Sequence, residues 1–318
     1  MAKKFTKWIK LPSELRLHPL SYCHTRELGQ YAQFSKLCNE EIQQFNIIAP
    51  KYLSVAESSN GNILICAKYS ITHEFYLDFA PASEDTHKLV RTSTGLGDWR
   101  GRFENDPILE GSAWQAAFKY LEKLLKYTTN TKIGELHVNC GEWPHEELRR
   151  IPAIYKVSYW NVQMYSTMCD AFINFMYETT NVKKLELNAD LVNRNLITLP
   201  SEFFNSTFFK QLEHANFDVK GEIANDDFLA SNAKYLHLQC DSISETAINQ
   251  KFRQWFETDI DLRFKFTFDG FRRWNYTVLF QNLPFERRSA IGPRYLIRQD
   301  GKVGVARIRY GQFEFSVQ

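Results

Sequence analysis

Five residues in or directly after short alternating segments have the side-chain types that catalysis uses: His137, His214, His237, Cys140 and Cys240. Imidazoles bind zinc where several ligands converge, and a thiol becomes a nucleophile beside a base. The histidines come from different segments, and no His-x-x-x-His or Glu-x-x-His pair supports any of the three. No motif places a base beside either cysteine. These residues therefore predict solvated histidines and inert thiols, with no metal site.

The segment 95–101 (GLGDWRG) is rich in glycine and precedes a predicted helix. It lacks the Lys-Ser/Thr pair of a phosphate-binding loop and the third glycine spacing of a dinucleotide-binding fingerprint. It therefore predicts a flexible loop. Since no paired carboxylates stand out either, we expect neither an enzyme nor a cofactor.

Composition and charge narrow the class of protein. Hydrophobic residues make up 44% and aromatic residues 15% of the 318-residue chain, which is enough for a core and excludes wholesale disorder. The net charge is only +2 without a dense basic stripe, so nucleic acid is not expected as a partner. The basic residues 1–10 precede no apolar run, and no stretch has the length of a membrane span. We expect no membrane partner and a cytoplasmic or nuclear location.

The elements that position these residues begin with an amphipathic helix, or a pair of helices, over 25–46. Asn60-Gly61 lies between two alternating segments and predicts a β-hairpin. Residues 81–110 are rich in Gly and Pro and predict a long surface loop. Ser112 then precedes a helix with a clear apolar face, and Ser244 is predicted to cap a later helix.

The second half of the chain repeats a short alternating segment every 20–30 residues, and the intervening segments are predicted as helices or turns. The segments are GELHVN, YKVSYW, KKLELN, EHANFD, KYLHLQ and RFKFTF, with first inward residues predicted at Leu136, Val157, Leu185, Ala215, Leu236 and Phe264. A strand-plus-helix unit at this period is typical of a leucine-rich-repeat-like solenoid in the α/β class. The alternative is two unrelated α/β pieces. The tail, including 274–281, predicts further strands with a turn at Asp300-Gly301.

Side chains alternate between the two faces of a strand, so the residues after the inward positions should face outward. These candidate target-binding residues are His137, Ser158, Trp160, Glu186, Asn216, His237 and Lys265. Trp160 is predicted as an aromatic anchor of the kind that dominates binding hot spots. The alternative is a solvated sheet face without a partner.

Two C-terminal motifs and one N-terminal motif carry a family resemblance. Asn249, Phe252 and Trp255 follow an Asn-x-x-Phe-x-x-Trp pattern before an apolar strand, and YLIRQDGKVGVARI (295–308) follows an Ile-Arg-x-Asp-Gly pattern. LPSELRLHPL (11–20) precedes a second helix like that of an F-box. The chain resembles nematode F-box proteins that carry an F-box-associated domain of the second type.

The resemblance implies an F-box-like helical segment over 1–50 and an F-box-associated, repeat-like domain with β-hairpins at either end over 51–318. It implies a non-catalytic substrate-recognition subunit of a cullin-based ubiquitin ligase, with a cullin adaptor and a target protein as partners. The implied adaptor-binding residues are Leu11, Pro12, Leu15, Leu17, Leu20, Leu28 and Phe34. The same side chains also fit an ordinary core stripe of a helix.

Pro19 departs from the family pattern, which has an aliphatic residue inside the docking helix at this position. A proline there removes an amide donor and costs roughly 3 kcal/mol or more. The helix should end or kink near Leu17. The adaptor contact then persists in weakened form, or the chain keeps the fold as a repeat-domain binding module without ligase assembly.

Overall fold

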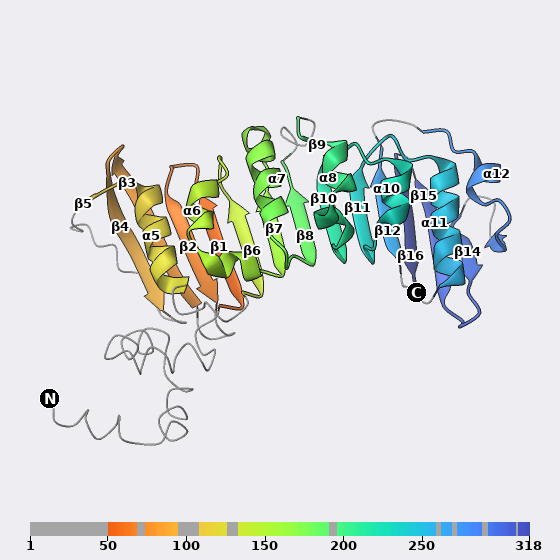
Figure 1. Cartoon of the computed structure of the whole chain (residues 1–318), viewed down its shortest axis with the longest axis horizontal. Helices are drawn as coiled ribbons and strands as arrows, with labels where there is room; N and C mark the ends of the chain where they lie inside the picture. The colour runs from red at the N-terminus through yellow and green to blue at the C-terminus, as the bar shows by residue number, and fades with distance from the viewer. Residues whose placement is uncertain are drawn as a thin grey trace, which may run out of the picture. The chain divides into compact units, whose positions relative to one another are not determined.

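The computed structural model describes residues 50–68, 74–94, 108–125, 133–190, 196–258, 262–268, 272–287, 292–309 and 311–318. Within these ranges the chain is mixed α/β, as predicted (Figure 1). The predicted adaptor-binding residues and Pro19 lie outside the described residues, so the division at residue 50 stays a prediction. The chain forms two compact units: unit 1 extends to Cys140 and includes Pro144–Ser158, and unit 2 contains Gly141–Trp143 and Tyr159–Gln318.

Unit 1 contains a sheet with the strand order β5-β4-β3-β2-β1-β6. Its elements are β1 (Tyr52–Glu57), β2 (Ile63–Lys68), β3 (Glu74–Ser83), β4 (Thr86–Thr94), β5 (Leu109–Glu110), α5 (Ala113–Leu125), β6 (Glu135–Asn139), α6 (His145–Arg149) and the 3-10 helix η2 (Pro152–Lys156). Neighbouring strands are antiparallel except β1 and β6, which are parallel. The apolar face of α5 lies against β2, β3 and β4.

Two expectations for unit 1 have opposite outcomes. The hairpin at Asn60-Gly61 is confirmed. Gly61 has a φ of +74°, a backbone conformation that glycine adopts without the steric penalty of a Cβ atom. The surface loop predicted over 81–110 is wrong for its first part, because β3 and β4 pair through Ser83 and Thr86. Pro81 lies beside a register shift in this pair, a position where a strand tolerates proline.

Unit 2 contains a sheet with the strand order β7-β8-β10-β11-β12-β16-β15-β14-β13, and β9 pairs with β10. Its strands are β7 (Tyr159–Gln163), β8 (Lys184–Asn188), β9 (Thr198–Leu199), β10 (His214–Gly221), β11 (Tyr235–Gln239), β12 (Arg263–Thr267), β13 (Phe285–Arg287), β14 (Arg294–Ile297), β15 (Val303–Arg309) and β16 (Gln312–Val317). Its helices are η3 (Ser166–Met168), α7 (Cys169–Glu178), α8 (Ser201–Asn205), α9 (Thr207–Lys210), α10 (Asn225–Ala230), α11 (Glu245–Glu257) and α12 (Tyr276–Leu279). The strands from β7 to β12 along the sheet are parallel, and those from β12 to β13 are antiparallel.

Capping residues set where two helices of unit 2 begin. Ser244 Oγ accepts a hydrogen bond from Ala247 N at 3.1 Å, which confirms the predicted cap of α11. The strand predicted over 274–281 is wrong. Asn275 Oδ1 instead accepts from Val278 N at 3.3 Å, so this capped segment forms the short helix α12.

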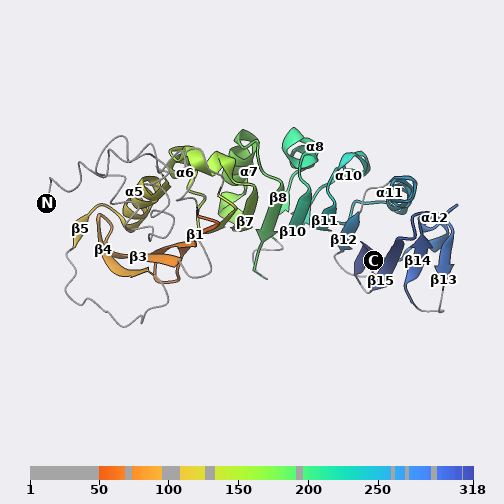
Figure 2. The ribbon, with the colours of Figure 1, turned by 90° about the horizontal axis from the view of Figure 1, so that it is seen from below.

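The core of unit 2 lies between the sheet and the helices α7, α8, α10 and α11, which occupy one face of the strands (Figure 2). Phe252 of α11 is fully buried, and its ring centroid lies 5.0 Å from that of Phe315 and 5.8 Å from that of Phe264. Gly304 lies where a Cβ atom would come within 2.6 Å of Phe315 Cζ and 2.9 Å of Trp255 Cζ3. The aromatic packing therefore requires glycine at this position of β15.

Candidate functional site: the open face of unit 2

The sheet of unit 2 has a second face on which none of the described helices lies (Figure 2). We call this side of β7, β8, β10, β11, β12, β16 and β15 the open face. Its central side chains, apart from the buried Val305 of β15, are polar and are exposed or half-buried, in alternation with buried apolar residues of the other face. They are Tyr159, Asn161, Lys184, Glu186, His214, Asn216, Tyr235, His237, Arg263, Lys265, Glu314, Ser316, Arg307 and Arg309.

Strand register brings four of the predicted target-binding residues into one row. Glu186 pairs with Asn216, Asn216 with His237, and His237 with Lys265 on neighbouring parallel strands. Neighbouring strands lie about 4.8 Å apart, so the row is continuous. Their outward placement is as predicted, and their role in binding stays a prediction.

Hydrogen bonds hold several side chains of the open face in place. Asn188 Nδ2 donates to Asn161 Oδ1 at 2.8 Å, and Asn161 Nδ2 donates to Glu186 Oε2 at 3.3 Å. His237 Nδ1 lies 2.8 Å from Asn216 Oδ1, where a protonated ring nitrogen donates. Side chains ordered in this way lose less conformational entropy when a partner binds.

His214 and Tyr235 form an aromatic pair on the open face. Their ring centroids are 4.5 Å apart with an interplanar angle of 13°. Burial, with help from Lys184, lowers the pKa of His214 although Glu186 Oε1 lies 3.6 Å from its Nε2. Burial and the carboxylates of Glu186 and Glu314 raise the pKa of Tyr235. Both rings are therefore neutral at pH 7 and form an uncharged part of the open face.

Two predicted residues belong to unit 1 and lie outside this row. His137 Nε2 on β6 hydrogen-bonds with the Glu135 carboxylate, and its ring lies 4.7 Å from that of Tyr52. Ser158 precedes β7 and is not part of a strand, and its Oγ donates to Gly134 O at 3.2 Å. Neither is placed by the strand pairing in unit 2.

The prediction that Trp160 faces outward is wrong. Trp160 is 0% exposed and pairs with the inward Leu185, while its ring lies 5.8 Å from Phe175 and 6.0 Å from Trp143. The cause is a register error: the buried Val157 ends a 3-10 helix before the strand, and the inward series of β7 begins three residues later. An odd shift moves every side chain of a strand to the other face. The outward residues of β7 are Tyr159, Asn161 and Gln163.

The repeat pattern missed the open-face residues on β15 and β16, because these strands do not belong to the repeat. In the strand register, Lys265 lies opposite Glu314, and Glu314 lies opposite Arg307. The alternation in QFEFSV and the turn at Asp300-Gly301 indicated both strands. Only the pairing of β16 with β12 shows that they extend the same face.

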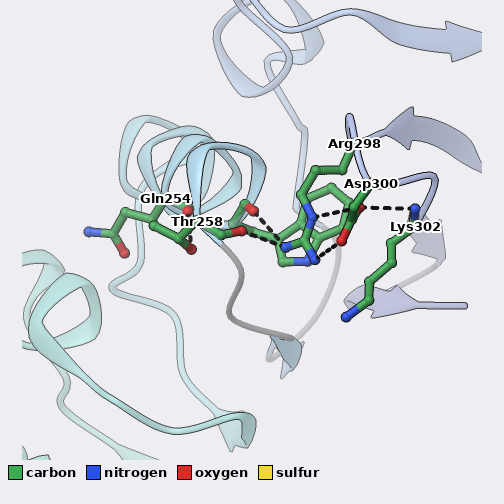
Figure 3. Close-up of polar contacts among 6 residues, drawn as sticks. Gln254, Thr258, Arg298, Asp300 and Lys302 are labelled. Carbon is green, nitrogen blue, oxygen red and sulfur yellow. Dashed lines mark hydrogen bonds and ion pairs between the residues drawn. The ribbon is translucent and has the colours of Figure 1, made fainter.

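The two C-terminal motifs on which the resemblance rests meet in the structure at Arg298, which is 5% exposed (Figure 3). Its Nη1 donates to Thr258 O at 2.6 Å and to Trp255 O at 3.2 Å, at the end of α11. Its Nε and Nη2 donate to the Asp300 carboxylate at 2.9 and 2.6 Å. The guanidinium carbon also lies 5.0 Å from the Trp255 ring centroid. The motif residues therefore join the C-terminal hairpin to α11 within unit 2.

Asn249, the first residue of the motif on α11, has a comparable role. Its buried Nδ2 donates to Leu279 O at 3.0 Å and to Gln281 O at 3.1 Å, at the end of α12. Its Oδ1 accepts from Arg253 Nε at 3.0 Å. These bonds satisfy carbonyl groups that the short helix leaves without intrahelical partners.

The ion pair of Asp300 predicts a pH-dependent stability. The hydrogen bonds from Arg298, and then the backbone N–H of Lys302, lower the pKa of Asp300 from 3.8 to about 2. Because the folded state holds this proton less tightly, the contribution is present above about pH 4 and is lost as the pH falls towards 2. We expect Asp300→Asn to be less stable than the wild type in urea at pH 6, with the difference shrinking below pH 4. A difference that stays constant down to pH 2.5 would contradict this account.

None of the described helices is long and apolar enough to span a membrane. Comparisons of the chain with protein-family models, with curated proteins and with solved structures found no match.

Proposed function

We propose that the chain is the non-catalytic substrate-recognition subunit of a cullin-based ubiquitin ligase. In this proposal the N-terminal F-box-like segment binds the adaptor, and the open face binds the target protein. The observation that carries the proposal is the open face, whose polar side chains are ordered by hydrogen bonds and lie under none of the described helices. The family resemblance of the motifs at both ends of the chain supports the adaptor.

The proposal includes the finer fold. The strands β7, β8, β10, β11 and β12 are parallel, and helices between them lie on one face of the sheet. This supports an irregular leucine-rich-repeat-like solenoid, because stacked strand–helix units share one continuous core. An F-box-like helical segment precedes it.

Co-purification with the cullin adaptor tests the ligase role. The wild type should retain the adaptor, and Leu15→Asp, Leu17→Asp should lose it, because a carboxylate buried in an apolar interface is strongly unfavourable. The matched control, Ser13→Asp, His18→Asp, adds the same charge at polar positions of the segment and should still bind.

The second candidate is a repeat-domain binding module whose altered F-box no longer assembles a ligase. Pro19 favours this candidate because it interrupts the predicted docking helix. If the folded wild type and both variants fail to retain the adaptor, the ligase role is refuted and this second candidate stands.

A further inference from the structure

Positive charge gathers on one part of the open face. Arg263 and Lys265 of β12 and Arg307 and Arg309 of β15 lie on either side of β16, whose Glu314 is the single carboxylate among them. We call these four cations the basic patch. The four cations and Glu314 together have a net charge of +3 (4 − 1), which is more than the net charge of +2 of the whole chain.

Register fixes the layout of the basic patch. Lys265, Glu314 and Arg307 form one row across β12, β16 and β15, and Arg309 lies in the next row, paired with Gln312. Lys265 and Arg307 are therefore about 10 Å apart across the strands, and the two cations of each strand are about 7 Å apart along it.

None of the four cations forms an ion pair within the described part of the chain. Arg307 Nη1 donates to Ser316 Oγ at 3.0 Å and Arg263 Nη2 to Val317 O at 3.4 Å, and both of these acceptors are uncharged. In the described part of the chain, no carboxylate lies within ion-pairing distance of the four cations. By contrast, Glu186 on β8 already accepts from Asn161 and lies beside His214. The free positive potential of the open face is therefore concentrated on β12 and β15.

We propose that the basic patch binds an extended acidic segment of the target protein, in which carboxylates alternate with uncharged residues. This rests on the proposed role of the open face in target binding. Alternate side chains of an extended segment repeat every 6.6–6.8 Å or so, which matches the spacing of the cations along β12 and β15. Glu314, between the two pairs, disfavours a continuous run of negative charge. Complementary charge of this kind supplies specificity and a fast association rate.

A peptide fits this surface better than a nucleic acid does. Single-stranded nucleic acids need exposed aromatic faces for base stacking as well as a positive groove. Tyr235, the aromatic residue next to Arg263 on the open face, already stacks on His214. Glu314 would also repel a phosphate backbone laid across the centre of the patch.

Fluorescence anisotropy with short labelled probes tests the proposal on the full chain at about 0.15 M salt. The probes are a peptide of about 12 residues that alternates Glu and Ser, its Lys–Ser counterpart, and an oligothymidylate of similar length. We expect the wild type to prefer the Glu–Ser peptide. Lys265→Glu, Arg307→Glu should weaken this binding about tenfold or more, since close charge pairs carry more than 1.4 kcal/mol.

Two further variants keep the test decisive. Lys119→Glu, Arg150→Glu changes the net charge equally at exposed positions of unit 1, outside the open face, and should weaken binding less than about twofold. Lys265→Gln, Arg307→Gln removes the charge with little change of size and should weaken binding in the same direction as the Glu variant. Equal losses in the patch and control variants, no preference for the acidic peptide, or tighter binding of oligothymidylate would each overturn the proposal.

Adaptor co-purification of the same variants separates this inference from the ligase role. The patch variants should retain the adaptor while losing the acidic peptide, because the adaptor is proposed to bind at residues 11–34. If the wild type binds the acidic peptide but not the adaptor, the basic patch stands and the ligase role does not.

Discussion

Replacing Trp160 with alanine should lower the free energy of unfolding by about 3–5 kcal/mol, the range for truncating a large buried aromatic residue. Trp160 is 0% exposed, and its ring centroid lies 6.0 Å from that of Trp143 and 5.8 Å from that of Phe175. Urea unfolding followed by circular dichroism measures the loss. Alanine leaves a cavity that the packed rings cannot fill, and the loss of transfer free energy adds to its cost.

Trp160→Phe and Tyr159→Ala are the controls for this prediction. Phenylalanine keeps most of the volume and should cost about 1–2 kcal/mol. Tyr159 faces outward on the same strand, so its truncation should change stability by less than that. If Trp160→Ala left the stability within about 0.5 kcal/mol of the wild type, Trp160 would be a surface residue and the sequence-based assignment of an anchor would be restored.

Replacing Arg298 with alanine should lower the free energy of unfolding by about 3 kcal/mol. The buried carbonyl of Trp255 and the partly buried carbonyl of Thr258 would lose their donor at the end of α11. An unsatisfied buried acceptor costs about 1–3 kcal/mol. The guanidinium also covers the Trp255 ring, so packing is lost with the charge. Urea unfolding at pH 7 is the measurement.

Arg298→Lys tests whether the forked geometry matters in addition to the charge. A lysine ammonium cannot bond the Asp300 carboxylate and two carbonyls at once in the same plane. We therefore expect Arg298→Lys to have a free energy of unfolding between those of the wild type and Arg298→Ala. Arg309→Ala, an exposed arginine on the same hairpin, should be nearly neutral. Equal stabilities of the alanine and lysine variants would contradict this expectation. They would show that a positive charge at residue 298 contributes nothing without the forked geometry.

Local signals predicted the elements whose chemistry lies within a few neighbouring residues. Asn60-Gly61 and Asp300-Gly301 form turns with glycine at positive φ, and Ser244 caps α11. These interactions join residues at most four positions apart, so the sequence contains them directly. Where two local signals competed, the prediction was wrong: apolar alternation over 274–281 favoured a strand, but the Asn275 cap formed a helix.

The sequence by itself determined the α/β class, the strands β6, β8, β10, β11 and β12, and the outward placement of Glu186, Asn216, His237 and Lys265. It determined them because alternation and helical periodicity are local properties of the chain. Only the tertiary structure decided that Trp160 is a core residue, because the inward register depends on where the strand begins against its neighbour. Only the tertiary structure placed Arg307 and Arg309 beside Lys265, and Arg298 against Trp255, because these contacts join strands and helices that lie more than 40 residues apart in the sequence.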